Sequence, residues 1–148
     1  MSNRETKPPG AVKVMVFGVF DGIHEGHRAF LKEAKSHGNY LIAVVTQDKI
    51  VERLKSHAPQ RKLAERFIAL ENENNVDMVV MGDDKSGSWE VVIKYKPDII
   101  ALGYDQEKLK ENLESNSKLF DWSPKIVTLN AHEPEILHSS LLKSRTQD

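Results

Sequence analysis

The sequence predicts an α/β fold: a doubly wound, Rossmann-like sheet of five mainly parallel strands between two layers of helices. Short apolar runs rich in β-branched residues alternate along the chain with segments that repeat apolar residues at helical spacing. The runs are nearly continuous, as in strands whose sheet is covered by helices on both faces. Glycines follow several of the runs, where loops would leave the strands.

Each element follows from its local pattern. The first strand contains only one polar residue, Lys13, and ends before Gly18, and Pro97 enforces an extended entry to the fourth strand. Gly38 is expected to be the C-cap of the first helix, and Asp48 is a candidate N-cap of the second. The expected strands are residues 12–17, 40–46, 76–81, 99–102 and 126–129. The expected helices are residues 27–37, 48–54, 63–72, 89–95, 107–117 and 139–145.

Length and composition limit the class of protein. The chain has 148 residues, which suits one domain at 11–148 after a flexible, proline-containing tail at 1–10. A formal net charge of -1 argues against a nucleic-acid partner. No apolar run approaches the roughly 20 residues of a membrane span, and no signal peptide is recognisable. The absence of cysteine excludes disulfides and thiolate metal sites and fits a cytoplasmic protein.

The loop at 18–27, GVFDGIHEGH, is the sharpest candidate for a functional site. Ligands of such sheets bind beyond the carboxyl ends of strands, where this loop is expected. Its glycines permit close approach of a ligand to the backbone, and the following helix N-terminus favours phosphate. His24 and His27 are three residues apart, so both can point inward. By spacing alone, a glycine-rich turn with two surface histidines remains an equal interpretation.

The same ten residues resemble the HxGH signature of the cytidylyltransferase-like nucleotidyltransferase superfamily, usually G-[TSN]-F-D-x-x-H-x-G-H. This sequence departs from it at Val19, where a hydroxyl or amide is common. Further segments resemble the family in the same order: Leu54 and Lys55 followed by Pro59 and Arg66, then residues 96–106 and 136–143. The second segment is similar to that of small archaeal FAD synthases and glycerol-3-phosphate cytidylyltransferases.

The resemblance implies roles for the loop residues. His24 and His27 would donate hydrogen bonds to a nucleoside triphosphate as charge develops during the reaction. Val19, Phe20 and Gly26 would contribute backbone contacts to the nucleotide. Asp21 is expected to steady the loop rather than to catalyse.

Residues of later segments complete the implied site. Lys55 would reach the α-phosphate or the acceptor phosphate, with a solvated lysine as the alternative. Arg66 would bind phosphate or acceptor, or else pair with a surface carboxylate such as Glu65. Asp105 would contact the ribose or base of the nucleotide, or serve only as a turn residue.

Two serines and a divalent ion complete the triphosphate site. Ser139 and Ser140 would bind the β- and γ-phosphates, and Ser139 also suits a helix N-cap. The resemblance implies Mg²⁺ or another divalent cation bridging the triphosphate. No structural metal is expected, because His24 and His27 lack a third ligand.

The implied reaction transfers a nucleotidyl group from ATP or CTP to a small phosphorylated acceptor and releases pyrophosphate. FMN adenylylation to FAD is the preferred form, and cytidylylation of glycerol 3-phosphate is the main alternative. A nucleotide-binding sensor without turnover, or a plain interaction module of the same fold, are alternatives of other classes. Proteins resembling this one are commonly dimeric, which leaves a homodimer open.

Overall fold

The computed structural model describes residues 10–85, 88–104 and 106–130 and contains one five-stranded sheet. The strands are β1 (Lys13–Gly18), β2 (Tyr40–Val45), β3 (Met78–Met81), β4 (Ile99–Leu102) and β5 (Lys125–Thr128). They lie in the order β3-β2-β1-β4-β5, and every neighbouring pair is parallel. The predicted fold class is confirmed, and within the described residues the sheet is wholly parallel.

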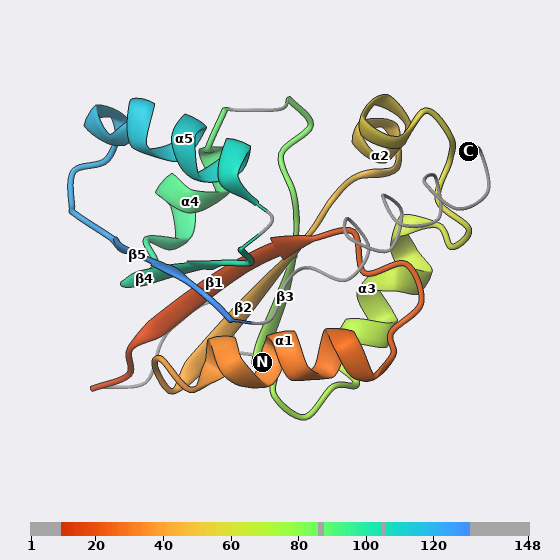
Figure 1. Ribbon diagram of the computed structural model, residues 1–148, viewed down its shortest axis with the longest axis horizontal. Coiled ribbons are helices and arrows are strands. Elements are labelled where there is room, and N and C mark those ends of the chain that lie inside the picture. The colour runs from red at the N-terminus through yellow and green to blue at the C-terminus, as the bar shows by residue number, and fades with distance from the viewer. Residues whose placement is uncertain (1–9, 86–87, 105, 131–148) are drawn as a thin grey trace.

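Helices cover both faces of the sheet (Figure 1). The helices are α1 (Glu25–Lys35), α2 (Asp48–Lys55), α3 (Leu63–Glu71), α4 (Glu90–Tyr95) and α5 (Glu107–Ser115), with a 3₁₀ turn at Ser117–Leu119. Figure 1 shows α1 and α3 on one side of the strands, and α4 and α5 on the other. None of the described helices has the length and apolar character that crossing a bilayer requires.

The side chains of β1 point alternately to the two faces of the sheet, and the core is accordingly divided into two clusters. Val14 and Val16 pack with Phe30 and Leu31 of α1, whereas Met15 packs on the opposite face with residues such as Val92 of α4. Successive strand residues point to opposite faces, so an uninterrupted apolar run fills both layers. This is why the strands lack the polar alternation of a half-exposed sheet.

The chain reverses direction across the sheet between β1 and β4. From β1 it winds outward through β2 to β3, then returns to β4 beside β1 and continues to β5. The carboxyl ends of β1 and β4 therefore flank the switch point, the usual position of a ligand crevice in such sheets. The loops that follow Gly18 and Leu102 both begin there.

Several element boundaries differ from those expected. The first helix begins at Glu25 and ends at Lys35, with Ser36 as its C-cap, so the expected start at 27 and cap at Gly38 were wrong. Gln47, not Asp48, caps α2. Strand β3 begins two residues later than expected, and β5 covers Lys125–Thr128. The helix expected at 139–145 lies outside the described residues.

Gly38 has a different role from a helix cap. A Cβ placed on it would stand 2.5 Å from the Val12 carbonyl oxygen and 2.7 Å from a methyl carbon of Val14. The backbone between α1 and β2 thus passes directly over the start of β1. Glycine is needed there for close approach of two chain segments.

We expect Gly38→Ala to lower the free energy of unfolding by about 1–3 kcal/mol, because overpacking forces the backbone apart. Urea denaturation measures the change. Gly82→Ala is the matched control, since its added Cβ would meet the Val45 carbonyl oxygen at the more tolerable distance of 3.1 Å. An equal cost for the two variants would contradict the steric explanation.

Candidate active site

The loop after β1 makes two sharp turns before it enters α1. Phe20 has φ 54° and Gly22 has φ 90°, and the Gly22 N–H donates to the Phe20 carbonyl at 3.2 Å. A positive φ is unusual for a bulky residue. The fully buried Phe20 ring packs in the core on the α1 face, 5.9 Å from the His27 ring centroid, and this burial holds the turn.

The two histidines form the cap of α1. His24 is the N-cap, and its Nδ1 accepts from the Gly26 N–H at 3.1 Å. In return, His27 Nδ1 accepts from the His24 N–H at 3.1 Å. This is a capping box with histidines in place of the usual Ser or Thr and Glu. Because Nδ1 accepts in both rings, each neutral ring carries its hydrogen on Nε2, which is a donor.

His27 differs from His24 in burial. His24 is exposed, whereas His27 retains only 1% of its accessible surface, so the interpretation of two surface histidines was wrong. Burial lowers the pKa of His27 to about 3, helped by the neighbouring charges of His24, Arg28 and Lys55. His27 is therefore neutral at pH 7 and can present its Nε2 hydrogen without exchanging a proton.

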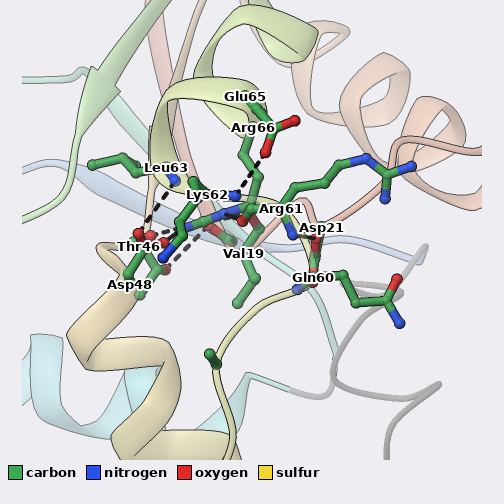
Figure 2. A network of polar contacts seen from close by, with 12 residues as sticks. Val19, Asp21, Thr46, Asp48, Gln60, Arg61, Lys62, Leu63, Glu65 and Arg66 are labelled. Atoms are coloured by element: carbon green, nitrogen blue, oxygen red, sulfur yellow. Dashed lines mark hydrogen bonds and ion pairs between the residues drawn. The ribbon is translucent and has the colours of Figure 1, made fainter.

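Arg66 lies at the centre of a buried polar network (Figure 2). Its Nη1 donates to the Val19 carbonyl at 2.9 Å and the Thr46 carbonyl at 2.8 Å, and its Nε donates to the Arg61 carbonyl at 2.9 Å. Its Nη2 pairs with an Asp48 carboxylate oxygen at 2.6 Å. Arg66 thus ties the loop after β1 to the end of β2, the start of α2 and the loop before α3.

Arg66 does pair with a carboxylate, as one sequence interpretation expected, but its partner is the part-exposed Asp48 and not Glu65. The Arg66 side chain is wholly buried, and the atoms it contacts belong to the protein. Glu65, the expected surface partner, accepts from the Lys62 N–H at 3.2 Å and caps α3 instead. Contact of Arg66 with phosphate or acceptor stays a prediction, whereas these hydrogen bonds give it a positioning role among the loops. The fixed, planar donors of a guanidinium suit this role.

Asp21 also steadies the loop, as the sequence predicted. Its two carboxylate oxygens accept from the N–H groups of Gln60 and Arg61 at 2.7 and 2.9 Å (Figure 2). The Val19 side chain is only 5% exposed. A buried apolar residue therefore occupies the position where the family pattern has a hydroxyl or amide.

Gln106 joins the two strands that flank the switch point. Its side-chain oxygen accepts from the Gly103 N–H at 2.8 Å, and its Nε2 donates to the Phe17 carbonyl at 3.2 Å. Gln106 is 6% exposed. The sequence analysis gave it no role, and a polar residue directly before a helix offered no signal of burial.

The other expected residues are placed only in part. Lys55 ends α2 and lies close enough to His27 to lower its pKa electrostatically. Asp105, Ser139 and Ser140 lie outside the described residues. Among the described residues, no group of three or more histidine or acidic side chains could hold a metal ion.

Comparison with known proteins identifies the family of this chain. The profile of the cytidylyltransferase-like family matches residues 15–145. The chain is 42% identical over 110 residues to the FAD synthase of Thermococcus sibiricus, covering 72% of this chain and 74% of the relative. It is 43% identical over 108 residues to the FAD synthase of Pyrococcus abyssi, covering 70% and 73%.

A solved structure supports the same assignment. The lipopolysaccharide core biosynthesis protein from Thermoplasma volcanium matches with a TM-score of 0.74 and 35% identity, covering 83% of this chain and 99% of that one. The fold and the HxGH loop define a nucleotidyltransferase, as the sequence predicted. The chain belongs to the cytidylyltransferase-like family.

We expect Arg66→Lys to lower the free energy of unfolding by about 3 kcal/mol, because a single ammonium cannot satisfy the carbonyls and the Asp48 carboxylate together. Urea denaturation measures the loss. The control is Arg28→Lys, whose half-exposed ion pairs with Glu25 and Glu73 contribute little to stability. A smaller loss for Arg66→Lys than for Arg28→Lys would refute the positioning role.

The lowered pKa of His27 makes stability depend on pH. The unfolded chain takes up a proton near pH 6.5, while folded His27 resists protonation until about pH 3. The unfolded state binds more protons within this window, so stability falls as pH falls. Between pH 7.5 and 5.5 this group should remove about 1 kcal/mol of stability.

The control is His27→Asn, whose side-chain oxygen can still accept from the His24 N–H but does not titrate. Urea denaturation of both proteins at the two pH values isolates the histidine. We expect the native chain to lose more stability on acidification than His27→Asn. Equal losses would mean that His27 is protonated in the fold at pH 5.5.

Proposed function

We propose that this chain is an FMN adenylyltransferase, which forms FAD and pyrophosphate from FMN and ATP. The HxGH loop at the sheet's switch point, with two histidine Nε2 donors on a helix N-terminus, carries the nucleotidyltransferase part of the proposal. Relatives that are named FAD synthases, aligned over about seven-tenths of this chain, support FMN as the acceptor.

The reaction needs little acid–base chemistry from the protein. The phosphate of FMN is largely dianionic at neutral pH. One of its oxygens attacks the α-phosphorus of ATP, the bond from that phosphorus to the α,β-bridging oxygen breaks, and pyrophosphate leaves with the electron pair. The enzyme therefore acts through positioning and through stabilising the charge that develops.

His24 and His27 supply hydrogen-bond donors in this scheme. Their Nδ1 atoms accept from backbone N–H groups, which places the hydrogen of each neutral ring on Nε2. A neutral His27 donates a hydrogen bond to the triphosphate without needing to be reprotonated after each turnover. Lys55 adds a positive charge near these rings, toward the α-phosphate or the acceptor phosphate.

The remaining contacts of the proposed site are inferred from the sequence. Asp105 would contact the ribose or base, and Ser139 and Ser140 would bind the β- and γ-phosphates. Gly26 and the backbone of Val19 and Phe20 would approach the nucleotide. The Val19 carbonyl already accepts from Arg66, so its contribution would come from the N–H group.

A divalent cation, such as Mg²⁺, is proposed to accompany the triphosphate. The described residues supply no carboxylate cage, and the Asp21 oxygens accept from two backbone N–H groups. Most ligands of the ion would therefore be phosphate and water oxygens. When bound, the ion would neutralise triphosphate charge, and no step assigned here to a side chain depends on it.

Pyrophosphate release from a matrix of ATP or CTP with FMN or glycerol 3-phosphate tests the substrates. We expect turnover with ATP and FMN, and identification of FAD by its chromatographic mobility. Faster turnover with CTP and glycerol 3-phosphate would replace the acceptor and nucleotide but keep the class. No pyrophosphate with any pair would reject the enzymatic proposal.

Two substitutions of His27 separate its structural role from its chemical role. His27→Asn keeps an acceptor for the His24 N–H but lacks the Nε2 donor, whereas His27→Ala lacks both. We expect both variants to lose about 100-fold or more in kcat, as removal of a charge-stabilising donor does. Only His27→Ala should also lose stability from the cap, by about 1 kcal/mol.

The readouts are initial rates of FAD formation and urea denaturation of the same preparations. Near-native kcat in His27→Asn would show that the ring serves only as a cap. Equal stability of the two variants would instead contradict the cap assignment.

A further inference from the structure

Arg61 lies next to the HxGH loop, and its backbone is held from two directions. Its N–H donates to an Asp21 carboxylate oxygen at 2.9 Å, and its carbonyl accepts from Arg66 Nε at 2.9 Å. Asp21 belongs to the loop after β1, and Arg66 holds that same loop through Val19. The Cα of Arg61 is therefore fixed relative to the HxGH loop.

The side chain of Arg61 lies against Gly22 of that loop. A Cβ built on Gly22 would stand 2.7 Å from Arg61 Nη1 and 3.5 Å from its Cζ. The guanidinium thus rests directly over the backbone of Gly22. In Figure 2 the Arg61 side chain points away from the buried network around Arg66, and the residue is exposed.

The donors of Arg61 have no acceptor among the described residues. The recorded hydrogen bonds of Arg61 use only its backbone. The Asp21 carboxylate accepts from the backbone N–H groups of Gln60 and Arg61, not from the Arg61 guanidinium. The guanidinium thus presents five N–H donors in a fixed geometry and a full positive charge. It does so directly beside Gly22, which has no side chain.

Positive charge also lies near the end of the HxGH loop, where α1 begins. Lys55 acts on His27 electrostatically, and the N-terminus of α1 contributes the positive end of its dipole. The nearby Glu25 is paired with Arg28 at 3.2 Å. Cationic groups beside a glycine-rich turn are suited to bind an anion that has several oxygen atoms.

We propose that Arg61 is a phosphate-binding residue of this site, an inference that rests on the proposed function. Its ligand is a phosphate group of one of the two substrates, the nucleoside triphosphate or the phosphorylated acceptor. The fork of a guanidinium binds two phosphate oxygens at once. The absence of a side chain at Gly22 lets the guanidinium rest against the backbone of the loop.

Equilibrium titrations of the native chain, Arg61→Gln and Arg61→Lys test the assignment. The probes are inorganic pyrophosphate and a non-hydrolysable ATP analogue for the triphosphate, and FMN compared with riboflavin for the acceptor phosphate. We expect Arg61→Gln to weaken the affinity for one of these two groups of probes, the triphosphate or the acceptor phosphate, on the order of ten-fold. This is the effect of losing one charged hydrogen-bonding contact. Arg61→Lys should fall between, because lysine keeps the charge but not the fork.

Lys118→Gln is the matched control. Lys118 is exposed in the 3₁₀ turn before β5, at the amino ends of the strands, and its removal changes net charge equally. We expect unchanged affinities in this variant. The melting temperature of Arg61→Gln should equal that of the native chain, because backbone atoms of residue 61 make the holding contacts.

Native affinity of Arg61→Gln for both phosphate sets would overturn the proposal, as would a native chain that binds neither set. A loss of affinity accompanied by a lower melting temperature, and equal for riboflavin and FMN, would assign Arg61 a purely structural role and also overturn it. Phosphate binding without turnover would reject the proposed enzyme while leaving Arg61 as a phosphate ligand.

Discussion

The buried guanidinium of Arg66 is the interaction on which the arrangement of the site depends. Its donors join Val19, the pair Thr46 and Asp48, and Arg61, which come from three separate segments at the carboxyl edge of the sheet. A charge taken out of water is costly unless its hydrogen bonds are satisfied, and here carbonyls and a carboxylate satisfy them. The geometry of the site is consequently set by a residue whose side chain is wholly buried.

In the histidine cap, one pair of imidazole rings serves both the folding of α1 and the proposed hydrogen bonding to the nucleotide. In each ring Nδ1 serves the backbone and Nε2 remains as the donor. The interaction that begins α1 also fixes the tautomer that the proposed role of the rings as donors requires. Burial of His27 completes the arrangement by keeping that ring uncharged.

The fold could be predicted from the sequence because continuous apolar runs of four to six residues identify strands covered on both faces. The HxGH loop was found by its glycines and its resemblance to a family. The start of α1 was missed because histidine is not a usual N-cap. Gly38 was misread because close approach of β1 is a tertiary contact, invisible in a local pattern.

Arg66 and Gln106 mark the limit of sequence reasoning for the same reason. Both are polar residues whose partners lie far away in the chain, such as Val19 for Arg66 and Phe17 for Gln106. Burial of a polar side chain depends on which loops meet at the edge of the sheet. That meeting is decided by strand order, which local propensity does not encode.

The order β3-β2-β1-β4-β5 also bears on how the protein acquires its site during folding. The pairing of β1 with β4 joins residues such as Val14 and Ile99, and Lys13 bonds to Asp98 across 85 positions of sequence. Contacts of such long range close large loops and form slowly. The half that holds the HxGH loop, Arg66 and β1 to β3 is contiguous in sequence, so a growing chain can assemble it first. The switch point between β1 and β4 forms only after β4 docks, so the site proposed there would be completed in the same step as the sheet.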